Sequence, residues 1–288
     1  MDEQEQQFVH EDPAAEEEQQ HGPHFTVFHA AGLFILLIVL EFWMEAILGK
    51  TTKIAEGSWM FIAIRNLISG LLTAKAGALL AGFTLTGLLF SPRVRWLTLI
   101  PVTICILGVT ILSSELQNLL VWIQPLPKEY TDLFTKLEEN SYGLLFTISV
   151  IAPLTEELLF RGVILEGLRQ NYRLLTAVFM SSVLFALAHI IPWLIVNAFF
   201  IGLILSWIKI ETGSLVPCLY AHALYNGMPW IVENTMKVQI PGFNLEQDTT
   251  VVQFQPVWFD LLGVALLFIG GILLWQMTIR TADGQSQE

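Results

Sequence analysis

Three charged residues within an otherwise apolar segment are the first candidates for chemistry. Glu156, Glu157 and Arg161 lie in the segment APLTEELLFRGVI. Helix residues four apart share a face, so Glu157 is expected to pair with Arg161, whereas Glu156 points about 100° away. An intramembrane charge is costly unless it is paired or lines a wet cavity. The unpaired carboxylate therefore indicates a functional site, with a structural charge network between helices as the alternative.

His189, in the sequence FALAH, is the candidate partner of Glu156. Glu156 lies 17 residues before Arg173, in the turn that follows its segment, and His189 lies 16 residues after it. In an antiparallel helical hairpin both side chains would lie at a similar depth, roughly 25 Å from the turn. A histidine that only satisfies a local hydrogen bond is the alternative interpretation.

His222 and Asn226, in the sequence AHALYNG, form a third polar group. Their spacing of four residues places both on one face of a helix. Polar side chains of this kind can join neighbouring membrane helices. They can also donate hydrogen bonds to an oxyanion, and their coincidence with the other two groups favours this second interpretation.

Together these residues suit hydrolysis of an amide by an activated water. Glu156 would act as general base and His189 would orient the water. His222 and Asn226 would stabilise the oxyanion, while Glu157 and Arg161 would orient the site. We expect Glu156, His189, His222 and Asn226 to converge on one cavity.

Two other chemistries remain possible at these residues. A zinc site of Glu156, His189 and His222 would use a known catalytic ligand set, although the sequence HExxH is absent. Cys218 lies one turn before His222 and could pair with it, but no third group is evident to orient the imidazole ring. Both are treated as alternatives to the carboxylate and histidine mechanism.

The composition indicates a polytopic membrane protein. The chain has 288 residues, of which 54% are hydrophobic and 14% charged. Since about 20 apolar residues cross a bilayer as a helix, we predict an all-α fold of about eight spans with the active site in an intramembrane cavity. The region from Ser58 to Phe90 is predicted to start at the interface and to contain one span that ends near Phe90. The other seven spans are predicted at 25–48, 96–122, 142–168, 174–190, 193–210, 214–232 and 257–277.

The domain organisation predicted is a transmembrane helical domain at 25–280, with the functional core at about 142–232, between two polar tails. Residues 1–24 are acidic, contain no Lys or Arg, and are expected to be disordered, as a solvated tail. Residues 281–288 form a short polar C-terminal tail.

Glu41 and Glu45 are expected to face the membrane interface as a pair. The two cysteines exclude a disulfide framework, and scattered basic residues exclude a nucleic-acid surface.

Lys and Arg residues near the predicted span ends give the orientation. With eight spans, a modest excess lies on one side of the membrane, which we assign to the cytoplasm together with both termini. The residues on that side are Arg93, Arg95, Arg169, Arg173, Lys209 and Arg280.

The three motifs resemble those of a known family. The sequences EELLFR, FALAH and HALYN match the patterns EExxxR, FxxxH and HxxxN of the CAAX-protease and bacteriocin-processing family, in the same order. The resemblance covers Glu156 to Asn226. It implies an eight-helix fold and a glutamate-type intramembrane endopeptidase that needs no metal or other cofactor.

The resemblance also assigns roles, with Glu156 as base, His189 as its partner, His222 and Asn226 as oxyanion donors, and Glu157 and Arg161 as supporting groups. The partners it implies are membrane lipid and a peptide or protein substrate, for which a prenylated C-terminus is one option; no nucleic acid is expected. The compact chain is more typical of a bacterial member, in the cytoplasmic membrane. A non-catalytic adaptor, an immunity factor or a transporter with a protonatable site remains the alternative function.

Overall fold

The protein is described by a computed structural model that covers residues 24–55, 57–89, 95–127, 141–232, 239–243 and 252–285. The secondary structure of these residues is helical, as predicted. The helices before the central region are α2 (Val27–Thr51), α3 (Trp59–Ala81), α4 (Leu85–Leu89), η1 (Trp96–Thr98) and α5 (Leu99–Ile123). The helices after it are α10 (Leu174–Leu187), α11 (Pro192–Thr212), α12 (Leu215–Ile231) and α13 (Val257–Gln285).

The central region is a single helical rod whose hydrogen bonding changes along its length. It consists of α7 (Ser141–Phe146), the π-helical segment η2 (Thr147–Ile151), α8 (Ala152–Glu157), a second π-helical segment η3 (Leu158–Leu165), and α9 (Glu166–Arg169). Every residue of η3 is buried. The rod therefore forms the centre of the bundle, and the residues of the first motif lie within it.

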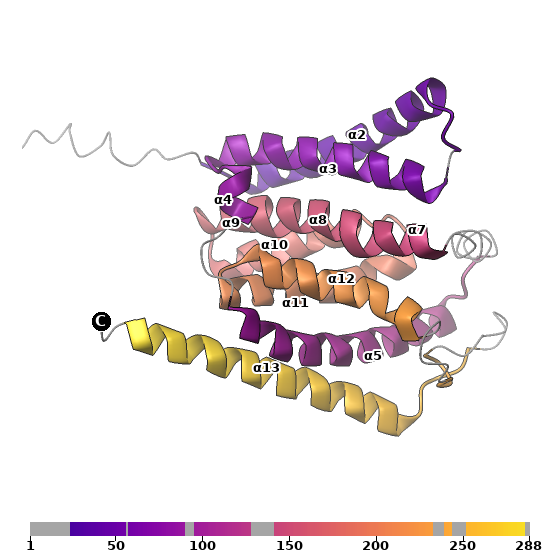
Figure 1. The fold of residues 1–288 in the computed structure, drawn as a ribbon, viewed down its shortest axis with the longest axis vertical. Coiled ribbons are helices and arrows are strands. Elements are labelled where there is room, and N and C mark those ends of the chain that lie inside the picture. Colours follow the sequence, from indigo (N-terminus) through magenta and orange to yellow (C-terminus); the bar gives the residue numbers. More distant parts are fainter. Residues whose placement is uncertain are drawn as a thin grey trace, which may run out of the picture.

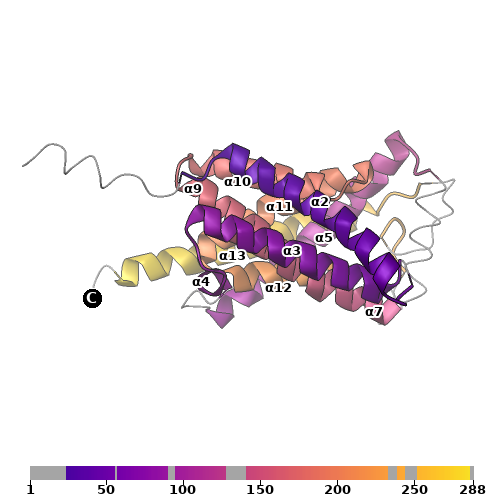
Figure 2. The ribbon, with the colours of Figure 1, turned by 90° about the horizontal axis from the view of Figure 1, so that it is seen from above.

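The helices are arranged in layers around this rod. Helices α2 and α3 pack together on one side, and α13 packs on α5 at the opposite side, with α10, α11 and α12 between them (Figure 1). Figures 1 and 2 show that α2 begins and α13 ends at the same end of the bundle, where α9 and α4 also lie. The polar motifs therefore lie between the pair α2 and α3 on one side and the pair α5 and α13 on the other.

Six helical stretches are long and apolar enough to cross a membrane, so the protein is a polytopic integral membrane protein. They are Val27–Thr51, Trp59–Ala81, Trp96–Ile123, Tyr142–Arg169, Pro192–Thr212 and Val257–Ile279. The two remaining predicted spans, α10 and α12, have 14 and 17 residues. At their usual rise these helices reach about 21 and about 26 Å, less than the roughly 30 Å hydrocarbon core. The structure therefore shows six candidate spans among the described residues, and the predicted total of eight is not shown.

The region from Ser58 to Phe90 differs from the prediction. The span comes first, as α3, and the short helix α4 follows it. Helix α3 begins where the Ser58 side chain accepts a hydrogen bond from the backbone of Phe61, and it ends at Gly82, whose φ of 75° is left-handed. Because glycine adopts this conformation without steric cost, it ends the helix well before Phe90.

The predicted tails fall largely outside the described residues. Of the acidic tail at 1–24, the structure describes only His24. Helix α13 continues to Gln285, so it includes part of the segment at 281–288 that was predicted as a polar tail.

Helices α5 and α13 approach closely through glycines. A Cβ atom added to Gly108 would collide with the backbone of Leu267 and Gly263, and one added to Gly270 would collide with the backbone of Cys105. Small residues allow this approach, which matters in lipid because helix association there depends on packing rather than on burial from water.

We expect Gly108→Ala to separate α13 from α5 and to destabilise the protein by about 1–3 kcal/mol, as overpacking does. Gly32→Ala is the matched control, because a Cβ atom at Gly32 meets nothing within 4 Å. The measurement is thermal unfolding of both variants in the same detergent. Equal midpoints for the two variants would contradict the close contact.

Candidate functional site

Pro153, within the central rod, leaves one backbone carbonyl of the rod free to accept a hydrogen bond from the HALYN motif of α12. In η2 the N–H of Ala152 donates to the carbonyl of Thr147, five residues earlier. In this pattern the carbonyl of Ile148 would pair with residue 153, but Pro153 has no N–H. The Ile148 carbonyl instead accepts a hydrogen bond of 2.8 Å from Nδ2 of Asn226. The sequence of the rod thus fixes the position of Asn226 on α12.

The predicted ion pair between Glu157 and Arg161 is confirmed. Glu157 Oε1 lies 2.8 Å from Arg161 Nη1, and both side chains have zero exposure. Arg161 Nη2 also donates to the carbonyl of Gly202 on α11, at 3.1 Å. Its guanidinium carbon lies 4.2 Å from the centroid of the Phe185 ring on α10. The pair therefore connects the rod to two neighbouring helices.

The same carboxylate oxygen also binds His222. The Nδ1 atom of His222 lies 2.8 Å from Glu157 Oε1, and since a carboxylate only accepts, the Nδ1–H donates. This bond turns the other ring nitrogen, Nε2, toward Glu156, whose Oε2 lies 3.8 Å away. The Glu157 carboxylate thus holds a cation on its own helix and an imidazole on α12.

Glu156 and His189 line one small cavity of about 80 Å³. This volume is enough for a few water molecules. The His189 Nδ1–H donates to the carbonyl of Phe185 at 3.0 Å, so in the neutral ring Nε2 is an acceptor. The side chain of Glu156 is 28% exposed, in contrast to that of Glu157. The predicted neighbour of the unpaired carboxylate is therefore present.

Helices α2 and α3 complete this cavity with residues that the sequence analysis did not assign to the site. Glu41 of α2 and Asn66 of α3 are both lining residues. Glu45, which was expected to face the interface together with Glu41, instead pairs with Arg65 at 3.0 Å. The prediction of an interfacial pair is wrong because the two carboxylates have different surroundings. An acid within an apolar span is itself a signal of function for Glu41, whereas a lone amide such as Asn66 gives little signal.

His189 lies in a turn and not inside a helix as predicted. Helix α10 ends at Leu187, and α11 begins at Pro192. Between them Ile190 has a φ of 59°, which is rare for a β-branched residue. Strained backbone of this kind concentrates at functional sites. The turn, together with the bond to Phe185, determines where the His189 ring points.

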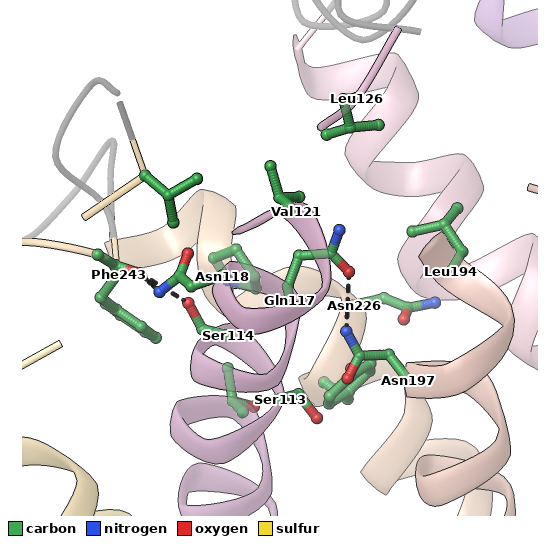
Figure 3. Close-up of a pocket in the computed structure, with 15 residues that line it drawn as sticks. Ser113, Ser114, Gln117, Asn118, Val121, Leu126, Leu194, Asn197, Asn226 and Phe243 are labelled. Atoms are coloured by element: carbon green, nitrogen blue, oxygen red, sulfur yellow. Dashed lines mark hydrogen bonds between the residues drawn. The ribbon is translucent and has the colours of Figure 1, made fainter. Parts of the chain in front are cut away.

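The four motif residues do not share one cavity. Asn226 lines a different and larger cavity, of about 500 Å³, which Figure 3 shows. His222 is buried between the two, with its ring toward Glu157. Glu156 and His189 therefore line one cavity and Asn226 another, with His222 of α12 between them.

The geometry does not favour the two alternative chemistries. Among the described residues, which include Glu156, His189 and His222, no three His, Cys, Asp or Glu side chains are placed to hold a metal ion. The buried thiol of Cys218 lies 3.5 Å from the carbonyl of Leu205 and 3.6 Å from that of Ser214, so its hydrogen bonds go to backbone and not to His222.

Comparison with known families identifies the region that carries the site. Residues 138–228 match the family described as type II CAAX prenyl endopeptidase Rce1-like. This segment is an Rce1-like domain. It covers about a third of the chain and contains all three motifs. Comparisons with curated proteins and with solved structures found no match.

The Rce1-like domain, which indicates a membrane endopeptidase, does not contain the whole cavity. It supplies Glu156 and His189, whereas Glu41 and Asn66 precede its first residue. The N-terminal helices α2 and α3 are therefore structural partners of the domain.

Loss of one member of the buried ion pair should destabilise the Rce1-like domain strongly. We expect Arg161→Met to cost about 3–5 kcal/mol, because it leaves the Glu157 carboxylate buried without its cation. Arg169→Met is the control: Arg169 pairs with Glu166 at 3.0 Å, but its side chain is 38% exposed, and such a pair contributes about 0–1 kcal/mol. Reversible unfolding in mixed micelles measures both. Similar losses of unfolding free energy for the two variants would contradict the claim that the buried Glu157 carboxylate depends on Arg161.

Proposed function

We propose that this protein is an intramembrane endopeptidase that hydrolyses a peptide bond with a water activated by Glu156 and His189. The observation that carries the proposal is the small cavity these two side chains line, within an Rce1-like domain. The family supports a peptide or protein substrate. A prenylated C-terminus is one option for that substrate. The modest excess of Lys and Arg on one side supports a location with both termini in the cytoplasm.

The two acceptors orient the water. A water in this cavity can donate one hydrogen to the Glu156 carboxylate and the other to Nε2 of His189, which leaves its lone pair for the scissile carbonyl. Glu156 takes the proton as the water attacks, and the proton then passes to the leaving amine. The carbonyl oxygen becomes an oxyanion in the tetrahedral intermediate.

The oxyanion requires donors on α12. Asn226 donates in any protonation state, and its Nδ2 carries a second N–H besides the one given to Ile148. His222 Nε2 donates only when the ring holds both protons, because its Nδ1–H is already bound to Glu157. Glu157 and Arg161 are positioning residues in this scheme, since they hold the His222 ring and do not contact substrate.

Glu41 is a second carboxyl group that lines the small cavity beside Glu156 and His189. Its place beside Glu156 and His189 allows it to relay the proton from Glu156 to the leaving amine. This role would make α2 part of the catalytic unit although it lies outside the Rce1-like domain.

The first test removes the base and its partner. We expect Glu156→Gln and His189→Ala each to lower the cleavage rate by about 10²–10⁴-fold, the usual contribution of general acid–base catalysis. The assay is hydrolysis of quenched fluorescent peptides, with and without a C-terminal farnesylcysteine, by the purified full-length protein.

The matched control for this test is Glu166→Gln. Glu166 is on the same rod, where it binds Lys209 at 2.6 Å, and it does not line the cavity. Its substitution should leave the rate unchanged. A chelator should also leave the rate unchanged, and a loss that zinc restores would point to metal chemistry. Cleavage that persists in folded Glu156→Gln would contradict the proposal and favour a non-catalytic adaptor.

A second test concerns Glu41. We expect Glu41→Gln to lower kcat by about 10²-fold with little change in KM, since the amide keeps the shape of the cavity but cannot relay a proton. Glu45→Gln is the control, because Glu45 binds Arg65 outside the cavity. The measurement is the steady-state kinetics of both variants. Equal kcat values for Glu41→Gln and Glu45→Gln would exclude Glu41 from the reaction.

A further inference from the structure

The small cavity beside Glu156 and His189 is rich in hydrogen-bond acceptors and poor in donors. The carboxylates of Glu41 and Glu156 only accept, and so does Nε2 of the neutral His189 ring, whose Nδ1–H is bound to a backbone carbonyl. The Thr155 hydroxyl donates to carbonyls of its own helix. Among the described residues that line the cavity, the one other side chain able to donate is the carboxamide of Asn66.

The orientation of this carboxamide is set by Arg65. The Oδ1 atom of Asn66 lies 3.3 Å from both Nε and Nη2 of Arg65. A guanidinium only donates, so the oxygen of the amide must face it and the Nδ2 atom must lie on the other side. Nδ2 makes no hydrogen bond within the part of the chain that the structure describes, and it is not among the unpartnered atoms closed off from solvent. Asn66 therefore has an accessible and unused N–H group.

Close packing of α3 on the rod places Asn66 beside the proposed base. Gly70, one turn after Asn66, lines the same cavity. A Cβ atom added to Gly70 would lie 2.5 Å from Cβ of Thr155, the residue before Glu156. Helix residues four apart share a face, so the contact at Gly70 brings Asn66 to the same side of α8 as the cavity.

We propose that Nδ2 of Asn66 donates a hydrogen bond to the oxygen of the activated water. This inference rests on the proposed function. In that scheme the water donates its two hydrogens to Glu156 and His189 and directs one lone pair at the scissile carbon. Its second lone pair then needs a donor, and Asn66 is the lining residue that can supply one.

This bond would act on the attacking oxygen as its charge develops. The oxygen becomes hydroxide-like as Glu156 takes the proton, and an N–H dipole already aimed at it stabilises that charge. With three partners fixed, the remaining lone pair is directed at the scissile carbon. Asn66 keeps both of its protons, so the path of the proton from the water to the leaving amine is unchanged.

The first experiment measures the kinetics of Asn66 variants. We expect Asn66→Ala to lower kcat by about 10²-fold with little change in KM, the usual cost of losing one preorganised donor. Asn66→Asp should lose at least as much, although it keeps the shape of the side chain and the oxygen that accepts from Arg65.

The matched control is Gln170→Ala. Gln170 also contacts α3 through an amide, which donates to the carbonyl of Ala81 at the far end of that helix, and it does not line the cavity. This variant should keep the kcat of the wild type. A similar loss in Gln170→Ala and Asn66→Ala would assign the effect to the docking of α3 and would contradict the proposal.

The second experiment measures binding without turnover. A phosphinate peptide carries two oxygens on a tetrahedral phosphorus, in place of the attacking water and of the carbonyl oxygen. The full-length protein in lipid nanodiscs is titrated with the phosphinate, and its Glu156→Gln form is titrated with the matching peptide. We expect Asn66→Ala to weaken phosphinate binding at least about 10-fold, as loss of a hydrogen bond to a charged group does, and to leave peptide binding nearly unchanged.

The two ligands separate the proposed role from the alternatives. A purely structural Asn66 would weaken both ligands alike, and an Asn66 that only assisted the proton relay of Glu41 would change neither affinity. Either result would overturn the proposal, as would a wild-type kcat in Asn66→Asp.

Hydrolysis of the same peptide by the wild type tests the proposed function separately. Hydrolysis that the Asn66 variants leave unchanged contradicts the role of Asn66 and leaves the endopeptidase standing. A wild type that neither hydrolyses the peptide nor binds the phosphinate more tightly than the peptide contradicts both.

Discussion

The buried carboxylate of Glu157 is the interaction on which the site depends. One oxygen, Oε1, binds Arg161 on the rod and His222 on α12, each at 2.8 Å. An isolated charge at this depth would be very costly, so the guanidinium and the imidazole are needed where they are. Arg161 in turn reaches the Gly202 carbonyl and the Phe185 ring. Removal of Glu157 would therefore break the contact between the rod and His222 of α12 and leave the Arg161 guanidinium without its carboxylate.

This arrangement divides two adjacent acids into different roles. Glu157 is fully buried and fully engaged, while Glu156 is partly exposed and faces a cavity that water can enter. The charge of the first is used for structure, and that of the second remains available for chemistry. Two π-helical segments flank α8. Pro153 leaves the Ile148 carbonyl of the first, η2, free to accept a hydrogen bond from Asn226. Such segments occur often at functional sites.

Sequence patterns predicted the parts of this site that depend on spacing along a helix. The Glu157–Arg161 pair and the similar depth of Glu156 and His189 follow from helical geometry and hydropathy. The contributions of Glu41 and Asn66 depend on how α2 and α3 dock, which no local spacing encodes. The same is true of the second cavity beside Asn226, which depends on the meeting of α5, α11 and α12. Six of the eight predicted spans are long and apolar enough to cross a membrane, whereas α10 and α12 are shorter, and the end of α10 at Leu187 reflects the turn before Pro192.

The most direct measurement of the central claim is an experimental structure of the Glu156→Gln protein with a peptide bound. The account predicts that the scissile carbonyl carbon faces a water held between residue 156 and His189 Nε2. Its oxygen should lie within about 3 Å of the Asn226 amide nitrogen. A peptide whose backbone lies outside both cavities, away from residue 156, would contradict the account.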